Sequence, residues 1–482
     1  MTTQKKEKPK KDPRNHLSFF KLLAFKSSDI SAAWINLIML NYLSIFASDT
    51  LGVQVHIVGI LLLVSKIVDA ITDVLAGKLI DNTHTKLGKG RPYEICILGM
   101  VLTSVFMFYA KPEWQYFAKL LWIFSMYTLC FAVFSTLRAT GGNPYTIRAF
   151  SNNPVVLRKV ASFGGIITMA GSIVMSVLFP RLLAHEALSE GLSAASYPSQ
   201  AGWMKCVAIV MIAAAFVGIF RFIFVKEDPS IDANTDQKPV KWKEIGVLFK
   251  KNKYTWLYAI IMLCYNISTS LAVGSYYFKY IIGDVKAQGM LSVVSIVLLP
   301  LMFTFPKIME KMGSMCKMIK YFCIIGVVGY LIVFFSGSFL PGVYLGYVLG
   351  AIPGLPVAYY GILFIMNICN YNESISLPRM DASSNILAGF ATKFGGALGS
   401  YITGLVLMIG GYISSTETVT QSASALLSIR IDFALVPAIL MIIMAIASTK
   451  FIGCEKAVAE WQEKKKTASA EKEAEASVET AA

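Results

Sequence analysis

The stretch VHIVGILLLVSKIVDAITDVLAGKLI, residues 55–80, indicates the fold class of the chain. It is longer than the roughly 20 apolar residues that a helix needs to cross the hydrocarbon core of a bilayer. Four charged side chains interrupt the run, and three of them, Lys66, Asp69 and Asp73, lie near its middle. Charges at such depth are costly and usually serve a function. We therefore interpret the stretch as a membrane-spanning helix that carries a site.

The composition extends this interpretation to the whole chain. Of the 482 residues, 55% are hydrophobic and only 15% are charged, whereas soluble proteins average about 25% charged residues. Twelve helices of roughly 20 residues would use about 240 residues and leave short loops and two tails. The eight cysteines are scattered without a CxxC pair, so neither a disulfide framework nor a zinc site is predicted. The composition excludes a water-soluble enzyme, a secreted disulfide scaffold and a disordered chain.

Apolar runs long enough to span a bilayer occur six times on each side of a polar central stretch. The first six are residues 30–48, 55–80, 93–110, 116–140, 160–183 and 203–225. The second six are residues 256–282, 290–307, 318–335, 343–369, 386–413 and 431–452. These runs predict an all-α integral membrane protein with twelve transmembrane helices.

Basic residues gather in alternate loops, and this pattern predicts the orientation of the helices. The chain has 44 Lys and Arg against 29 Asp and Glu, with basic residues concentrated in the N-terminal tail, in loop 82–92 and in the central stretch 226–253. Loops 185–201 and 415–428 contain neither Lys nor Arg. Because basic loops face the cytoplasm, we expect a multi-pass plasma-membrane protein with both termini cytoplasmic. The basic excess then requires no nucleic-acid partner.

The loop after the second helix is similar in the two halves. Both LIDNTHTKLGKGRPYEI (residues 79–95) and PKIMEKMGSMCKMIKY (residues 306–321) are basic turns with a central glycine. This repeat favours two six-helix bundles related by a pseudo-two-fold axis, an arrangement typical of transporters. The predicted parts are a cytoplasmic N-terminal segment 1–27, bundles 28–225 and 254–452, a cytoplasmic linker 226–253 between them, and a solvated cytoplasmic tail 453–482.

Lys66, Asp69 and Asp73 are spaced by three and four residues. They share one face of a helix, with the two carboxylates about 6 Å apart along its axis. A charge this deep costs roughly 2.5 to 3.5 kcal/mol, so the acids need a bound cation, a proton or a basic partner. One interpretation is a coupling-ion site, for which carboxylate oxygens suit sodium. The other is a structural Lys66–Asp69 ion pair that joins helices.

The segment VDAITDVLAGKLIDNTHTKLGKGRPYE, residues 68–94, resembles a signature of the glycoside-pentoside-hexuronide:cation symporters. This family is a branch of the major facilitator superfamily that includes the melibiose permeases. Further segments similar to its motifs follow in the family's order: SDTLGV (48–53), NPYTI (143–147) and LPRMDASSNILAGFATKFGGALGSYITG (377–404). The resemblance covers nearly the whole transmembrane length and implies the major facilitator fold, in two six-helix bundles.

The resemblance also implies roles for individual residues. Asp69 and Asp73 match the family's cation-site acids, which would hold the sodium ion if sodium is coupled. Asp29 matches a helix-one acid that contacts sugar hydroxyls, and Lys393 matches a helix-eleven lysine near both sites. Tyr145 belongs to the Pro-Tyr motif and is assigned to the substrate site.

Two family positions are occupied differently in this chain. Gly142 stands in place of a helix-four acid or amide that binds galactosides, and either Gly164 or Arg158 stands in place of the helix-five arginine. Arg138, roughly 13 Å inside span four, is either a cavity-facing substrate or gating residue or a snorkelling side chain. The two glycines would open space, and Arg138 and Lys393 would supply positive charge. These features predict that a negatively charged glycoside such as a glucuronide is preferred over neutral disaccharides.

We expect a secondary active transporter, not an enzyme. It would move a glycoside, hexuronide or related sugar together with sodium or a proton by alternating access. We expect no cofactor besides the coupling ion, and a monomer in the lipid bilayer. One alternative is that the scaffold carries a larger amphipathic solute, such as a steroid conjugate or lysolipid. A membrane-embedded sensor or enzyme is the other alternative, which no soluble domain, His cluster or nucleophile constellation in the sequence supports.

Overall fold

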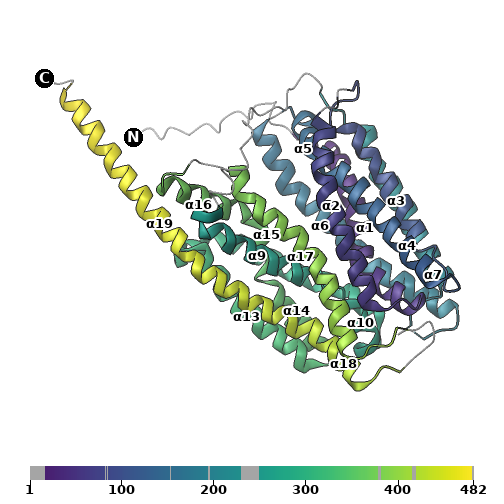
Figure 1. The fold of residues 1–482 in the computed structure, drawn as a ribbon. Helices are drawn as coiled ribbons and strands as arrows, with labels where there is room; N and C mark the ends of the chain where they lie inside the picture. Colours follow the sequence, from purple (N-terminus) through teal and green to yellow (C-terminus); the bar gives the residue numbers. More distant parts are fainter. Residues whose placement is uncertain are drawn as a thin grey trace, which may run out of the picture. The chain divides into compact units, whose positions relative to one another are not determined.

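The protein is built from helices in its computed structural model (Figure 1). The structure describes residues 17–479 except 82, 84, 152, 194–195, 229–248, 378–380 and 415–419. Within these residues the only β-type pairing is an isolated bridge between Thr85 and Gly88. The predicted all-α class is therefore confirmed.

Five of the six spans before the central stretch begin within six residues of their predicted positions, whereas α1 begins at Phe19, eleven residues before the predicted start at residue 30. Residue Pro154 opens the fifth span, where the fixed φ of proline suits the first helical turn, and Ser199 caps the sixth by accepting a hydrogen bond from the Gly202 N–H. The elements are α1 (Phe19–Ile45) with the π-helical turn η2 (Phe46–Thr50); α2 (Val55–Asp81); η3 (Arg91–Ile95) with α3 (Cys96–Met107); α4 (Tyr116–Thr128) with η4 (Leu129–Ser135) and α5 (Thr136–Ala149); α6 (Pro154–Ser189); and α7 (Gln200–Phe224).

The spans after the central stretch are more broken. The run predicted at residues 343–369 consists of three helices, because Pro353 and Pro356 lack the N–H that a continuous helix needs. The elements are α9 (Lys253–Thr269) with α10 (Gly274–Tyr277) and η5 (Phe278–Ile282); η6 (Val285–Gly289), α11 (Met290–Val294), η7 (Ser295–Leu298) and α12 (Leu299–Met312); α13 (Met315–Ser336); α14 (Leu340–Ala351), α15 (Gly354–Tyr359) and α16 (Gly361–Ser374); α17 (Asp381–Ile409); and α18 (Ala423–Arg430) with η8 (Ile431–Leu435) and α19 (Val436–Glu479).

The number of spans agrees with the predicted twelve. Among the described residues, eleven helices or continuous helical runs are long and apolar enough to cross a membrane. The predicted span at residues 93–110 corresponds to η3 and α3, which together fall short of the roughly 20 residues that a crossing needs. The last helix, α19, continues to Glu479 (yellow in Figure 1), so the tail predicted from residue 453 extends the final span as a helix.

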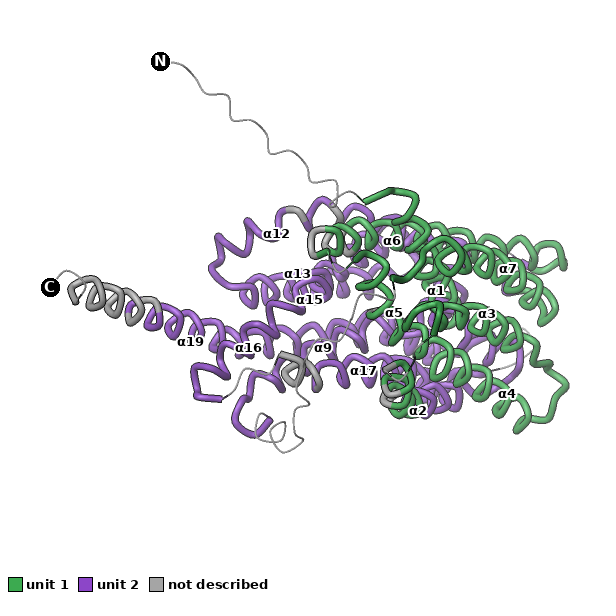
Figure 2. Tube along the Cα trace, turned by 90° about the horizontal axis from the view of Figure 1, so that it is seen from above, with its two compact units in different colours: residues 1–39, 67–192, 198–236 green, residues 40–66, 193–197, 237–482 purple. Residues whose placement is uncertain are grey.

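The chain forms two compact units, which are coloured separately in Figure 2. Unit 1 contains Met1–Met39, Ile67–Leu192 and Pro198–Asp236, and unit 2 contains Leu40–Lys66, Ser193–Tyr197 and Gln237–Ala482. The divisions fall inside α1 and α2, so the units do not coincide with bundles 28–225 and 254–452. Those bundle boundaries stay a prediction.

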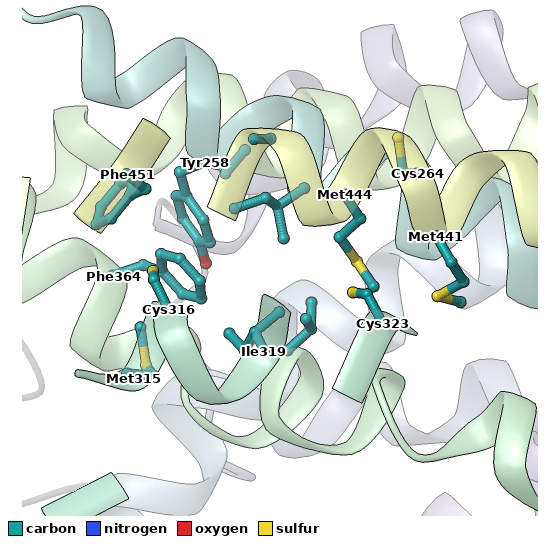
Figure 3. Close-up of a cluster of buried hydrophobic side chains, with 14 of the residues drawn as sticks. Tyr258, Cys264, Met315, Cys316, Ile319, Cys323, Phe364, Met441, Met444 and Phe451 are labelled. Atoms are coloured by element: carbon teal, nitrogen blue, oxygen red, sulfur yellow. The ribbon is translucent and has the colours of Figure 1, made fainter. Parts of the chain in front are cut away.

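The core of unit 2 is packed with sulfur-containing and aromatic side chains. In Figure 3, Ile319 and Cys323 of α13 face Met444 and Met441 of α19. Polarisable thioethers fill irregular gaps between helices, and such van der Waals packing stabilises contacts between membrane helices, because lipid tails are as apolar as the side chains themselves. All eight cysteines are free thiols, as their scattered spacing predicted.

A buried glutamate holds the loop that follows α2. The Glu227 side chain has no exposed surface, and it accepts hydrogen bonds from the backbone N–H groups of Lys89 at 3.0 Å, Gly90 at 3.0 Å and Arg91 at 2.9 Å. Gly88 has φ +112°, and a Cβ there would overlap the Glu227 carboxylate. This position therefore requires glycine for both its backbone conformation and its lack of a side chain.

The corresponding loop of unit 2 is held in a similar way. Glu455, on α19, accepts hydrogen bonds from the Ser314 hydroxyl and from the Cys316 N–H, the latter at 3.2 Å. Gly313 has φ +64° and ends α12. The similarity of the two loops thus extends from their basic composition to a glycine turn and a glutamate that binds the start of the next helix.

Candidate functional site

Asp69 lies in the middle of α2 and is the more buried of the two predicted cation-site acids. Its side chain is 7% exposed, and its Oδ1 accepts a hydrogen bond from the Thr136 hydroxyl at 2.6 Å. Thr136 begins α5 directly after the π-helical turn η4. A short bond to a carboxylate of this kind is stronger than a bond between neutral groups, and π-helical turns often occur at functional sites.

Asp73 follows one turn later on α2 and is half-buried. The helical conformation of residues 55–81 confirms that Asp69 and Asp73 share a face, about 6 Å apart along the axis. Within the described residues, no group of three His, Cys, Asp or Glu side chains is arranged to hold a metal ion. A sodium ion at α2 would therefore need hydroxyl or backbone oxygens in addition to these carboxylates.

Asp29, on α1, is at the centre of an ion-pair network within unit 1. Its carboxylate lies 3.0 Å from Lys26 Nζ, 3.2 Å from an Arg138 guanidinium nitrogen and 2.9 Å from one of Arg221. The Asp29 side chain is 26% exposed, whereas that of Arg221 is only 4% exposed. Arg221 also pairs with the buried Glu94 at 3.0 Å.

These five residues, Lys26, Asp29, Glu94, Arg138 and Arg221, are called the Asp29 network below. It contains three cations and two carboxylates and so carries one excess positive charge. A buried ion pair is stable only when its remaining hydrogen-bonding groups are satisfied. Glu94 Oε2 and Arg138 Nε are both buried, and neither has a hydrogen-bond partner among the described atoms.

Arg138 is an internal ion-pair partner, not a side chain that reaches toward the membrane surface. Its guanidinium is 13% exposed and contacts Asp29 and the Ser28 hydroxyl, both on α1. Asp29 pairs with Arg138 but is shared with two other cations, so the network keeps one excess positive charge. The predicted role of Arg138 as a source of positive charge for the substrate stays a prediction. Of the predicted substrate residues, the structure brings Asp29 and Arg138 together.

Tyr145 is buried in the core of unit 1, next to Phe25. Its hydroxyl donates to the carbonyl of Val225 at 2.7 Å and lies 3.1 Å from that of Arg221, so it closes the C-terminal end of α7. In this arrangement the hydroxyl is engaged by the protein itself. The predicted contact of Tyr145 with substrate stays a prediction.

The two glycines predicted to open space behave differently. A Cβ at Gly142 would meet no atom within 4 Å, whereas a Cβ at Gly164 would overlap the Lys26 side chain. Lys26 therefore fills the space beside Gly164 and brings a cation to it. Arg158, the other candidate for the helix-five arginine, has its side chain outside the part of the chain that the structure describes.

Lys393 is half-buried on α17, in unit 2. Its predicted place beside the acids of α2, which belong to unit 1, stays a prediction. The sequence analysis missed Thr136, Glu94 and Arg221. Arg221 could have been found from the sequence, because it is a charged residue within an apolar span, and such a charge is by itself a reason to expect a partner.

A second ionic cluster surrounds Asp49, the acid of the SDTLGV motif, within unit 2. Asp49 pairs with Lys279 and accepts hydrogen bonds from Ser48 at 2.8 Å, from Tyr280 at 2.6 Å and from Tyr412. The Asp49 side chain is 7% exposed. Its carboxylate thus joins η2 and η5 to Tyr412, which follows the C-terminal end of α17.

Comparisons with known proteins relate these sites to a family and a fold. A family model described as "MFS/sugar transport protein" matches residues 24–451. The isoprimeverose transporter of Lactiplantibacillus pentosus is 26% identical over 445 residues, covering 90% of this chain and 88% of that protein. A glucuronide carrier protein homolog of Escherichia coli is 22% identical, and the match covers 82% of this chain and 84% of that protein.

Solved structures support the fold alone. A bacterial homolog of the human lysosomal transporter Spinster has a TM-score of 0.64 and 13% identity, and the match covers 94% of this chain and 99% of that one. The nucleoside transporter NupG has a TM-score of 0.57 and 15% identity, and the match covers 91% of this chain and 99% of that one. Identity at this level carries no information on the solute.

Proposed function

Because the chain belongs to the MFS/sugar transport family, we propose that it moves a glycoside or related sugar across the membrane together with a cation taken up at α2. The protein is a multi-pass membrane transporter with the major facilitator fold and not an enzyme. Its mechanism is alternating access, in which a central site opens first to one side of the membrane and then to the other.

The observation that carries the cation proposal is the environment of Asp69. This carboxylate is almost fully buried at the middle of a membrane helix, and Thr136 donates a 2.6 Å hydrogen bond to it. With Asp73 one turn away, two acids on one face of a membrane helix require positive charge nearby, because each charge at this depth is costly. A sodium ion or a proton completes the site.

The sugar proposal is supported by the Asp29 network. Asp29 is the most exposed member of the network, and its carboxylate, which three cations already contact, has room for about one more donor such as a sugar hydroxyl. Lys26 supports the same assignment, because it places a cation beside Gly164, where the family resemblance expects an arginine. With that space filled, the alternative of a bulky amphipathic solute rests on the open space at Gly142 alone.

We propose further that the sugar is negatively charged, as in a glucuronide. The Asp29 network has one excess positive charge, and the buried Arg138 Nε has no acceptor among the described residues. A carboxylate or other acceptor on the solute would satisfy such a donor with a charge-assisted bond. The similarity to a glucuronide carrier homolog is consistent with this preference.

Accumulation of sugar in proteoliposomes tests the cation proposal. In Asp69→Asn and Asp73→Asn proteins, we expect cation-driven accumulation to be lost while exchange of sugar across the membrane at equal concentrations continues. Glu310→Gln, which changes an exposed acid at the end of α12, serves as the matched control and should accumulate normally. Normal accumulation with unchanged ion dependence in both α2 variants would refute the assignment.

Competition against uptake of a labelled glucuronide tests the solute. We expect unlabelled glucuronides to compete better than neutral galactosides, and Arg138→Gln to reduce that difference by roughly tenfold or more, because a lost charge-assisted bond is worth about 1.5 to 3 kcal/mol. A neutral galactoside that competes better than glucuronides would overturn the preference for an anion.

The plasma membrane, cytoplasmic termini and a monomeric state complete the proposal. The orientation is supported by the alternation of basic loops along the sequence. Loop labelling, described in the Discussion, tests it.

A further inference from the structure

A buried acid outside α2 lies in the last membrane-spanning run. Asp432 belongs to the π-helical turn η8, between α18 and α19, and has no exposed surface. It is nine residues from the start of α18 at Ala423, about 14 Å along the helical axis. Asp432 therefore lies at the start of the apolar run predicted at residues 431–452, inside the last helical run of the chain.

The carboxyl group of Asp432 is poorly satisfied by its surroundings. Neither oxygen has a hydrogen-bond partner of good geometry in the described part of the chain, and the polar side chain that faces it is Thr403 of α17. The Thr403 oxygen itself accepts a hydrogen bond from the backbone N–H of Ala272 at 3.2 Å. Thr403 therefore offers Asp432 only partial support.

No cation among the described residues neutralises Asp432. Arg430 is two residues away on the same helical run, and side chains at this spacing do not face each other. Its guanidinium lies over the Phe334 ring and donates to the Phe334 carbonyl. The other titratable side chains that contacts place at this turn are Tyr277 and Tyr347, which stack on the adjacent Phe433, and Tyr330, which lies beside Tyr347.

Phe433, the residue after Asp432, packs against two other aromatic rings beside the turn. Phe433 stacks on Tyr277, with ring centroids 4.2 Å apart, and on Tyr347 at 6.4 Å. The Tyr277 hydroxyl is directed elsewhere, because it donates to the Gly337 carbonyl. Apolar ring faces exclude water from the turn, and an ionised carboxylate without a partner is strongly disfavoured in such surroundings.

We propose that Asp432 is a proton-binding site of this transporter, separate from the acids of α2, and that its proton exchanges with water during the transport cycle. In the buried arrangement the group is the neutral carboxylic acid. When the turn opens to water, the acid releases its proton to solvent and becomes a carboxylate, and it must take up a proton again before it returns to the buried state. The π-helical turn supports this exchange, because irregular backbone in a membrane helix is frequent at functional positions.

The inference rests on the chain being a transporter but not on the cation proposed for Asp69 and Asp73. Infrared difference spectroscopy of the purified protein in lipid at neutral pH tests it directly. We expect the C=O stretch of a protonated carboxylic acid to disappear in Asp432→Asn and to shift in Asp432→Glu. Asp284→Asn, at an acid between two spans that caps η6, is the control and should leave the band unchanged.

Each result of that measurement decides the question. Loss of a carboxylate band instead of the acid band in Asp432→Asn would overturn the proposal, because Asp432 would then be ionised. Failure of Asp432→Asn to fold would also contradict it, because the amide has the shape and neutrality of the protonated acid. The Asp432→Glu spectrum provides a second reading in that case, since a protonated glutamic acid gives its own shifted band.

The pH dependence of sugar exchange tests whether the proton leaves during transport. Exchange in proteoliposomes with equal pH on both sides should decline at alkaline pH in the wild type, by up to about tenfold per pH unit for one proton. Asp432→Asn should lose this decline, because its amide never needs to be protonated again, whereas Asp284→Asn should retain it. An Asp432→Asn protein with the wild-type pH profile would refute the exchange of this proton. Loss of cation-driven accumulation in the Asp69 and Asp73 variants is a separate outcome, so the two proposals are able to fail independently.

Discussion

Replacement of Asp29 by Asn removes the charge that balances three cations while keeping the shape of the side chain. Arg221, which is 4% exposed, would keep only Glu94 as an ionic partner, and Lys26 and Arg138 would lose their carboxylate partner in the described network. Loss of one member of a buried ion pair costs about 3 to 5 kcal/mol, whereas an exposed pair contributes about 0 to 1 kcal/mol. Because Asp29 is 26% exposed, we expect Asp29→Asn to lower the free energy of unfolding by about 2 to 3 kcal/mol, between these two limits.

A double-mutant cycle isolates the contribution of the Asp29–Arg138 pair. The unfolding free energies of wild type, Asp29→Asn, Arg138→Gln and the double variant would be measured in one detergent by thermal or chemical denaturation. We expect a coupling of about 1 to 3 kcal/mol, because residues in one ion-pair network are not additive. The double variant should be more stable than the sum of the single effects indicates, since it leaves less unbalanced charge.

Two results would refute this reasoning. An Asp29→Asn protein as stable as wild type would show that the network does not stabilise unit 1, and a coupling near zero would show that the 3.2 Å contact with Arg138 carries no energy. Sugar binding to the folded Asp29→Asn protein gives an independent answer. A stable variant that no longer binds sugar would place Asp29 in the substrate site without a structural role.

Three further changes test other parts of the structure. Glu227→Gln should destabilise unit 1 by roughly 3 kcal/mol in the same unfolding assay. The reason is that an amide NH₂ would face backbone N–H donors that now share a carboxylate. A change below about 0.5 kcal/mol, which is within the range of neutral surface substitutions, would contradict the role of this glutamate. Asp49→Asn should leave Lys279 buried without its counter-ion and slow sugar exchange at least severalfold, whereas unchanged exchange would show that the cluster has no role in transport. An impermeant thiol reagent added from outside to a protein lacking its native cysteines should label a cysteine placed at Glu190 and not one placed at Lys89, and the reverse pattern would invert the proposed orientation.

The spans could be predicted from the sequence because the hydrophobic effect acts on whole segments. A run of apolar residues such as 55–80 must form a helix in a bilayer, since no water is present to satisfy its backbone. The break of the tenth span at Pro353 was not predicted, although proline carried the signal. The span predicted at residues 93–110 begins at Arg91 as a tight 3₁₀ turn, where Glu227 holds the backbone, and α3 ends at Met107, three residues before the predicted end.

The candidate site was only partly predictable. Asp69 and Asp73 were found because two acids in one apolar run are conspicuous and their spacing alone places them on one face. Thr136 was missed, because a threonine is common in membrane helices and its bond to Asp69 joins residues far apart in sequence. The pairing of Arg138 with Asp29 was missed for the same reason, since spacing along one helix carries no information about its neighbour.

The two loop-holding glutamates bind mainly main-chain N–H groups, and this has a consequence for how the protein diverges in evolution. Main-chain amides are the same in every residue except proline, so positions 89, 91 and 316 are able to change identity without weakening those bonds. After an ancestral duplication, Glu227 and Glu455 would thus remain recognisable even when the loop sequences had diverged. Each of them is placed at or beyond the end of the sixth span of its half. Internal symmetry in distant relatives should accordingly be sought in the spacing from such an acid to a left-handed glycine and not in matched loop sequences.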